Sequence, residues 1–274
     1  MRTIVITGGT DGMGAALAGH YLRAGERVVV IGRSTEKFRA LVAAAGAESG
    51  SSVEARAEFV QADLSLIADA RRVVDQLTER YDRVDALVLA ASFIRQRRHV
   101  TTEGREASWV LFFVSKYLLV TGLAGLLGEA KRPVIANTAV PGAKANAIDF
   151  DDLELAHRFS FARSNAQQRR ANELLGLLAT RDARLSYFLW GPARLVRTSF
   201  AGEVGPVMKA AAAVLAPLVG QDPAVAVRPL ISLLDDPSPG RAAYRGARPM
   251  ALTAGPDDAR DTTRLAAALE DSWR

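Results

Sequence analysis

The chain has 274 residues, no cysteine and a formal net charge of +5 at pH 7. This length fits one large α/β domain, the absence of thiols excludes disulfides and cysteine chemistry, and no apolar run approaches the roughly 18 residues of a membrane span. Because the first predicted strand begins at residue 3, we expect no signal peptide, no membrane partner and a cytoplasmic protein.

The positive charge comes mostly from arginine, and one dense cluster follows a predicted strand: Arg95-Gln96-Arg97-Arg98-His99. Nucleic-acid binding requires basic residues gathered on one face with interleaved aromatics, so we expect no nucleic-acid partner. The cluster is either a solvated loop or an attraction for an anionic substrate at the ligand edge of the sheet.

Short apolar runs alternate with longer helical patterns along the chain. Runs such as Val28 to Ile31 are typical of strands covered on both faces, and the alternation predicts an α/β fold, a Rossmann-type doubly wound parallel sheet of about seven strands in a single domain, 1–274. The predicted strands are 3–6, 27–31, 57–61, 85–90, 133–137, 184–189 and 248–252. The predicted helices are 13–24, 35–46, 66–80, 103–128, 160–181, 223–235 and 257–272. The small, apolar segment 199–220 is either a flap over the ligand cleft or an ordinary surface helix.

The first strand leads directly into a glycine-rich turn and a helical pattern: Thr7-Gly8-Gly9-Thr10-Asp11-Gly12-Met13-Gly14. Glycines at this spacing let the backbone approach a dinucleotide pyrophosphate, and the helix N-terminus supplies N–H groups and a partial positive charge. The strand at 27–31 completes a unit of about thirty residues, which is the context that this motif requires. The motif therefore predicts a bound dinucleotide.

The end of the second strand predicts which dinucleotide binds. It reads Ile31-Gly32-Arg33-Ser34, and in this fold that position faces the adenosine ribose. An acidic residue there binds a free 2′-hydroxyl, whereas arginine accommodates a 2′-phosphate. Arg33, assisted by Ser34 and Lys37, favours NADP(H), although Asp11 adds negative charge in the same loop.

The chain resembles the short-chain dehydrogenase/reductase family over essentially its whole length. The resemblance rests on Thr7, Gly8, Gly12 and Gly14 of the opening motif, on Ala62-Asp63-Leu64, and on segments like those of the retinol-dehydrogenase-type branch: Thr102-Glu103-Gly104, 148–153 and Ala171-Asn172. Val196-Arg197-Thr198 resembles the family's segment whose Thr contacts the nicotinamide amide. The resemblance implies dimers or tetramers through the helices at 103–128 and 160–181. It implies a cofactor site formed by Gly8, Thr10, Asp11, Gly12, Met13, Gly14, Arg33, Ser34, Asp63, Leu64, Ala90, Ala91, Arg169 and Thr198.

The residues that run the family's chemistry are replaced. The Asn-Asn-Ala-Gly segment reads Leu89-Ala90-Ala91-Ser92, the mid-helix Asn aligns with Phe112, the Ser with Ala139, and the Tyr-x-x-x-Lys pair with Asn165 and Arg169. We therefore take Asn165, Arg169 and Ser92 as the candidate catalytic residues. The Asn165 amide can donate a hydrogen bond, and Arg169 is a permanent cation able to bond ribose hydroxyls. The Ser92 hydroxyl either contacts cofactor or substrate or is simply tolerated.

The missing tyrosine removes a general acid, which is typically worth about 10²–10⁴-fold in rate. A carbonyl conjugated in an aromatic or quinonoid system needs that acid least, because the charge delocalises as a phenolate and a neighbouring phenol or water can give the proton. We therefore expect NADPH-dependent reduction of a carbonyl on a polycyclic aromatic polyketide, as in the atypical, angucyclinone-type ketoreductases of antibiotic biosynthesis, which the chain resembles. The alternatives are an inactive NADP-binding sensor or scaffold and a redox-neutral cyclase or dehydratase.

Three other residues could be mistaken for, or replace, the missing acid. Lys116 and Tyr117 are adjacent in the sequence, so they point to different helix faces and form no displaced Tyr/Lys pair; we expect them to serve packing and solvent contact. His157 precedes the helix of Asn165 and could reach the cleft as a substitute acid. No His and carboxylate cluster has the spacing of a metal site.

Overall fold

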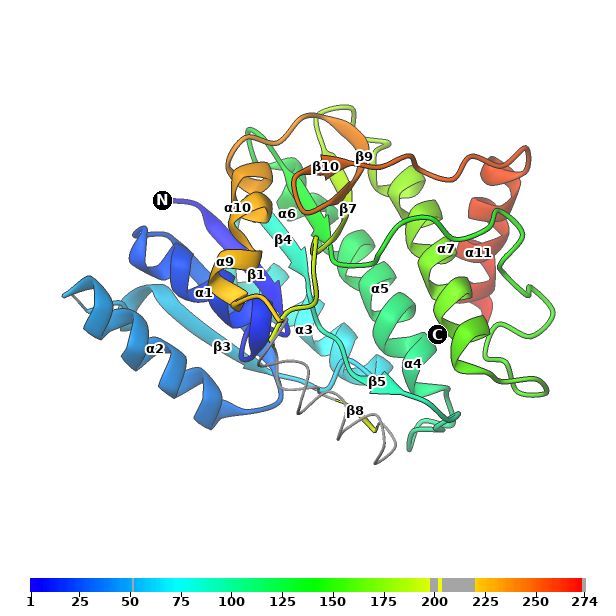
Figure 1. Ribbon diagram of the computed structural model, residues 1–274, viewed down its shortest axis with the longest axis horizontal. Helices are drawn as coiled ribbons and strands as arrows, with labels where there is room; N and C mark the ends of the chain where they lie inside the picture. Colours follow the sequence, from blue (N-terminus) through cyan, green and yellow to red (C-terminus); the bar gives the residue numbers. More distant parts are fainter. Residues whose placement is uncertain (51, 198–201, 204–219, 273–274) are drawn as a thin grey trace.

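The strands form an eight-stranded sheet of order β10-β9-β7-β6-β4-β1-β2-β3 (Figure 1). The computed structural model describes residues 1–50, 52–197, 202–203 and 220–272, so Thr198 and most of the segment 199–220 lie outside the described residues. The strands are β1 (Thr3–Thr7), β2 (Arg27–Gly32), β3 (Ala57–Gln61), β4 (Ala86–Leu89), β6 (Val134–Asn137), β7 (Ser186–Gly191), β9 (Gly240–Arg245) and β10 (Arg248–Pro249). Every pair in this sheet is parallel except β9 with β10, while β5 (Ile94–Arg95) and β8 (Gly202–Glu203) form a separate parallel pair.

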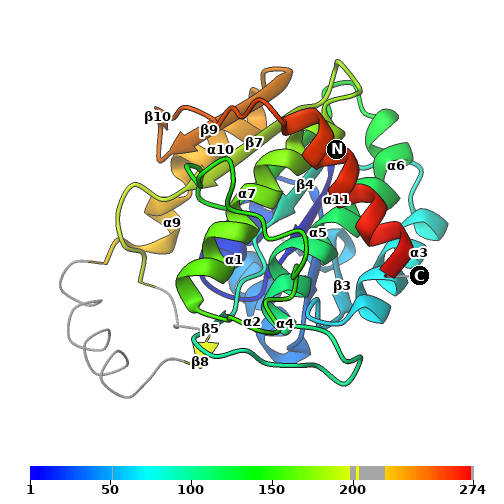
Figure 2. The same cartoon turned by 90° about the vertical axis from the view of Figure 1, so that its right-hand side faces the viewer.

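Helices cover both faces of the sheet, which confirms the predicted doubly wound α/β fold. Alternate residues of β2 pack on opposite sides: Val28 and Val30 join a core cluster with residues of α1 and α10, and Val29 and Ile31 join one with residues of α3, α5 and α7. Figure 2 shows α11 along the outside of α7, which it contacts. The helices are α1 (Gly12–Arg23), α2 (Thr35–Ser49), α3 (Ile67–Arg80), α4 (Ala107–Trp109), α5 (Ser115–Gly122), α6 (Ala124–Gly128), α7 (Phe161–Ala179), α9 (Pro223–Ala226), α10 (Arg228–Asp235) and α11 (Asp258–Ser272), with a 3-10 turn η1 (Glu54–Arg56) and a π-helical turn η2 (Val110–Val114).

The far edge of the sheet differs from the expectation. Strand β9 pairs in parallel with β7, from Ser186 opposite Gly240 to Gly191 opposite Arg245. Its sequence, Gly-Arg-Ala-Ala-Tyr-Arg, carries neither a β-branched run nor a regular alternation, so the apolar pattern did not indicate a strand. The strand expected near 248–252 is the two-residue β10.

The helix expected over 103–128 is divided. Glu106 caps the first turn, where its carboxylate accepts hydrogen bonds from the backbone N–H groups of Ser108 (3.1 Å) and Trp109 (2.6 Å). The wide turn η2 then separates α4 from α5, and Leu123 separates α5 from α6. Capping at Glu106 starts the helix later than the sequence pattern suggested.

A buried arginine joins α7 to α11 and to the loop after β6. Arg170 is 1% exposed and pairs with Glu173 (Nη1 to Oε2, 3.1 Å) and with Asp258. The second carboxylate oxygen of Glu173 accepts from the backbone N–H of Gly142 at 2.9 Å. These bonds satisfy charges that would be costly if buried alone, and they hold that loop against α7. Among the described residues, every helix is too short or too polar to traverse a lipid bilayer.

Replacing Gly176 of α7 by alanine is expected to destabilise the protein. The new Cβ would lie 2.7 Å from the ring of Tyr187, which is 2% exposed. Overpacking of this kind costs about 1–3 kcal/mol, which outweighs the gain of up to about 1 kcal/mol from removing a helical glycine. Urea unfolding measures the effect. In the control Gly125→Ala, the Cβ meets no atom within 4 Å, so equal stability of the two variants would contradict a rigid contact at Gly176.

Candidate functional site

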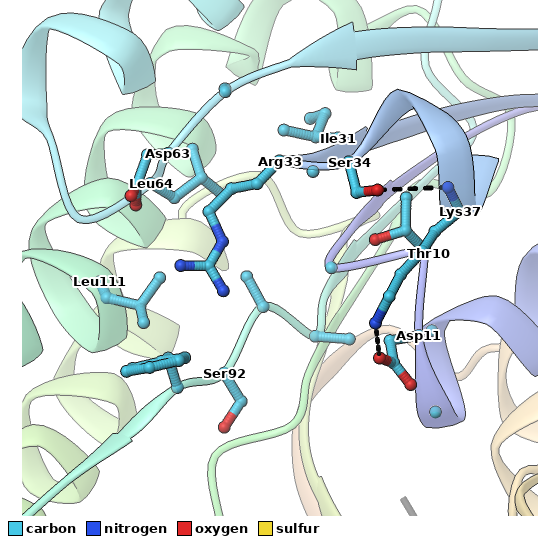
Figure 3. A pocket seen from close by; sticks show the side chains of 18 of the residues that line it. Thr10, Asp11, Ile31, Arg33, Ser34, Lys37, Asp63, Leu64, Ser92 and Leu111 are labelled. Carbon is cyan, nitrogen blue, oxygen red and sulfur yellow. Dashed lines mark hydrogen bonds and ion pairs between the residues drawn. The ribbon is translucent and has the colours of Figure 1, made fainter. Parts of the chain in front are cut away.

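The carboxyl ends of the strands surround a first cavity of about 510 Å³ (Figure 3). A volume of this size is typical of small-molecule and cofactor sites. Of the residues predicted to bind the cofactor, those that line it are Gly8, Thr10, Asp11, Gly12, Met13, Gly14, Arg33, Ser34, Asp63, Leu64, Ala90 and Ala91. Because β1, β2, β3 and β4 are parallel, the loops after them meet at one edge of the sheet.

The glycines allow a close approach of three backbone segments. Gly8 has a φ of +68°, and a Cβ there would lie 2.7 Å from Cα of Ala91. A Cβ at Gly14 would lie 2.3 Å from the carbonyl oxygen of Gly8. Helix α1 begins at Gly12 without a side-chain cap, so its first N–H groups are available to an anion. The first cavity therefore fits a dinucleotide with its pyrophosphate at this helix end.

The charges at the ribose end of the cavity favour a phosphate. Lys37 forms an ion pair with Asp11 and its backbone N–H donates to Ser34 Oγ at 3.2 Å, as Figure 3 shows. The lysine thus offsets the acidic residue in the loop. The exposed Arg33 extends across the cavity, with its guanidinium carbon 5.0 Å from the ring centre of Phe93. Sequence reasoning did not single out Phe93, which also stacks with Arg95 at 4.6 Å.

A second cavity of about 300 Å³ adjoins the first and shares Ala91, Ser92, Ile94 and Arg95 with it. The three candidate catalytic residues, Ser92, Asn165 and Arg169, line this second cavity. Its other lining residues are Ser108, Phe112, Lys116, Thr138, Ala139, Val140, Phe161, Ser164, Gln168 and Asn172. The second cavity therefore lies directly beside the one that fits a dinucleotide.

Arg169 lines only the second of the two cavities. Its Nε donates to the carbonyl oxygen of Val140 at 2.7 Å, and its Nη2 donates to that of Pro141. The guanidinium therefore holds the loop after β6, one helical turn from Asn165, which is exposed. The sequence predicted that Arg169 bonds the ribose of the cofactor, and it did not predict these bonds to the loop after β6.

A buried hydrogen-bond network lies behind the second cavity, and we call its members Lys116, Asn137, Asn172 and Tyr187 the Asn137 network; Lys116 and Asn172 line the cavity itself. Lys116 Nζ donates to Asn137 Oδ1 at 2.8 Å. Asn137 Nδ2 donates to Asn172 Oδ1 at 2.6 Å and to the Tyr187 hydroxyl at 2.8 Å. The Tyr187 hydroxyl donates in turn to the backbone carbonyl of Asn172 at 2.7 Å. The network connects α5, β6, α7 and β7.

The position of Lys116 contradicts the expectation of solvent contact. The side chain is 3% exposed, lines the second cavity, and burial lowers the pKa of its amine to about 7. The adjacency argument remains valid for Tyr117, which lines neither cavity. The spacing of an α-helix could not predict this burial, because Phe112, four residues earlier, lies inside the π-helical turn η2.

Other candidate acids do not lie at the cavities. Tyr187 lines neither of them, and burial raises the pKa of its hydroxyl. His157 is exposed and is absent from both linings. Among the described residues, no three His, Asp or Glu side chains are placed to hold a metal ion. The titratable group that the structure brings to the substrate side is therefore Lys116.

Known proteins with the same fold are similar to this chain, and the match to a family model covers the glycine-rich turn. Residues 2–139 match the family model of the short chain dehydrogenases. The chain belongs to the short-chain dehydrogenase family.

Within this family, the chain is 29% identical over 181 residues to a Streptomyces sp. (strain C5) protein assigned as the daunorubicin C-13 ketoreductase DnrU, covering 66% of the chain and 61% of that protein. It is 25% identical to human polyprenol dehydrogenase over 62% of the chain and 52% of that protein. The matches thus span only 61% and 52% of these relatives. A short-chain dehydrogenase from Sphingobium yanoikuyae in complex with NADPH has a TM-score of 0.63 and 20% identity, covering 100% of this chain and 96% of that one. This likeness shows the fold.

Raising the pH from about 7 to 9 is expected to stabilise the wild type relative to Lys116→Met. Burial lowers the pKa of this amine from 10.5 to about 7, so between these values the unfolded chain holds more protons than the folded one. Stability then rises with pH, by at most about 1.4 kcal/mol per pH unit. The variant lacks the group, so the difference between the two free energies of unfolding in urea isolates it. A difference that stays constant with pH would contradict a buried amine with a lowered pKa.

Proposed function

We propose that the protein is an NADPH-dependent reductase that reduces a carbonyl conjugated to a polycyclic aromatic ring system, as in aromatic polyketides. The observation that carries the proposal is the junction of the two cavities at Ala91 and Ser92. It places a dinucleotide groove beside a chamber that has no tyrosine at the usual place, where Asn165 stands. The similarity to DnrU, whose name gives the C-13 ketone of daunorubicin as its substrate, supports the reduction of a ketone.

The first cavity supplies the groups that would hold the cofactor. The turn from Gly8 to Gly14 and the start of α1 would bind the pyrophosphate. Asp63 is oriented by hydrogen bonds that its Oδ1 accepts from Ser65 N–H (2.9 Å) and Oγ–H (2.7 Å), and its carboxylate would bond the adenine. Arg33 would bond the 2′-phosphate, since Lys37 already offsets Asp11.

The second cavity supplies an environment for a developing negative charge. A reduced nicotinamide held in the first cavity would supply a hydride to the carbonyl carbon, which would leave negative charge on the carbonyl oxygen. Arg95, Lys116 and Arg169 line the chamber, and positive groups preorganised around such a charge stabilise it in the transition state. Phe112 and Phe161 line the same chamber and suit a planar aromatic ligand.

The proton need not come from position 165. An asparagine amide donates a hydrogen bond but carries no ionisable proton. Addition of hydride at the carbonyl carbon would leave the oxyanion on a saturated carbon, and a neighbouring phenol of the substrate or water would supply its proton. The main contribution of the site is then orientation, and well-oriented contact can lower a barrier by up to about 7–11 kcal/mol.

Arg33→Ala is expected to weaken NADPH binding by about 10–100-fold and to leave NADH binding unchanged. The loss corresponds to about 1.5–3 kcal/mol for a hydrogen bond to a charged group. Fluorescence titration with each reduced dinucleotide measures both dissociation constants. Arg39→Ala, six residues further along the chain and exposed on α2, is the matched control. Equal losses for NADPH and NADH would contradict a role in 2′-phosphate recognition.

Asn165→Ala is expected to lower turnover only a few-fold, because this residue gives no proton. The assay follows NADPH oxidation with emodin, phenanthrenequinone and daunorubicin as probes, with product identified by mass spectrometry. Complete loss of turnover with intact folding and NADPH binding would contradict this mechanism. A wild type that binds NADPH but oxidises it with none of the probes would instead indicate a sensor or scaffold, and product formed without NADP(H) would indicate a cyclase or dehydratase.

A further inference from the structure

Lys116 is the buried cation of the substrate chamber. It lies on α5 directly after the wide turn η2, and it lines the second cavity together with Ser108 and Phe112, at four-residue spacing. Its side chain is 3% exposed. A lysine this deeply buried is unusual in a folded protein unless it is paired.

One neutral hydrogen bond anchors the amine. Its partner among the described residues is Asn137 Oδ1, at 2.8 Å. The orientation of Asn137 is unambiguous, because its Nδ2 must donate to Asn172 Oδ1 and to the Tyr187 hydroxyl. An ammonium has three N–H donors, and the bond to Asn137 uses one of them.

The other charged groups at the chamber are also cationic. Arg95 from β5 and Arg169 from α7 line the same cavity. The nearby carboxylate of Glu173 is bonded to Arg170 and to the Gly142 N–H. In the described part of the chain, no carboxylate forms a salt bridge with Lys116. Burial therefore acts on the amine unopposed and brings its pKa to about 7, which is close to the value that suits proton transfer near neutral pH.

We propose that Lys116 is the general acid of this enzyme, taking the place of the tyrosine that Asn165 replaces. The inference rests on the proposed function and replaces the proton from the substrate or water by one from Lys116. As the hydride forms the new C–H bond, the two π electrons of the carbonyl move to oxygen, and that oxygen takes a proton from Lys116 Nζ. The product is an alcohol together with the oxidised dinucleotide. The neutral amine stays bonded to Asn137 and regains a proton from water after product release.

The experiment compares wild type, Lys116→Met and a control, Lys131→Met, whose lysine is exposed. The probe is whichever of emodin, phenanthrenequinone or daunorubicin the wild type reduces. We expect Lys116→Met to lower kcat by about 10²–10⁴-fold with the Kd for NADPH unchanged, and Lys131→Met to match the wild type.

The pH profile separates a proton donor from a packing residue. Because the protonated amine is the active form, kcat of the wild type should fall as pH rises above about 7. The kcat of Lys116→Met should not show this fall with pH. A variant that keeps kcat within a few-fold and still shows this fall would overturn the inference while leaving the reductase activity established.

Two further outcomes remain decisive. If Lys116→Met does not fold, Lys116→Gln provides a polar replacement, and a wild-type kcat that stays level or rises between about pH 7 and 9 overturns the inference without any variant. If the wild type binds NADPH but reduces none of the probes, the proposed function fails and the proton donor fails with it.

Discussion

The buried carboxamide of Asn137 is the interaction on which the reactive end of the molecule depends. It is placed at the carboxyl end of β6 and accepts from Lys116 and from the backbone N–H of Ala139, at 2.8 and 3.1 Å. Its amide nitrogen, Nδ2, donates hydrogen bonds to Asn172 of α7 and to Tyr187 of β7. Buried polar groups that are fully satisfied specify one arrangement of the elements around them. The wall of the second cavity is therefore rigid, and the amine has one defined position.

The cofactor half of the site could be predicted from the sequence because its residues lie in short segments at known places. Gly8, Gly12 and Gly14 occupy one turn between a strand and a helix, and Arg33 ends the next strand. Parallel pairing then brings these segments to the same edge of the sheet. The twelve such residues in the first cavity required no knowledge of long-range contacts beyond the order of the strands.

The substrate half could not be predicted to the same depth, because long-range contacts decide it. Spacing placed Asn165 and Arg169 on one face of a helix, yet it did not reveal that the guanidinium bonds the carbonyls of Val140 and Pro141. The burial of Lys116 depends on a partner 21 residues away. Strand β9 was missed for the same reason, because its identity comes from pairing with β7.

The wide turn η2 determines which functional group the wall of the chamber carries. A π-helical turn contains one more residue than an α-helical turn, and each residue of an α-helix is rotated by about 100° from the last. An uninterrupted helix over the same residues would bring Ser115 to the place of Lys116 and rotate the amine away from Asn137. The rotation of the helix after η2 therefore decides whether the Ser115 hydroxyl or the Lys116 amine lies at this place. Related chains could exchange one for the other by gaining or losing a single residue in Val110–Val114, with no substitution at the wall itself.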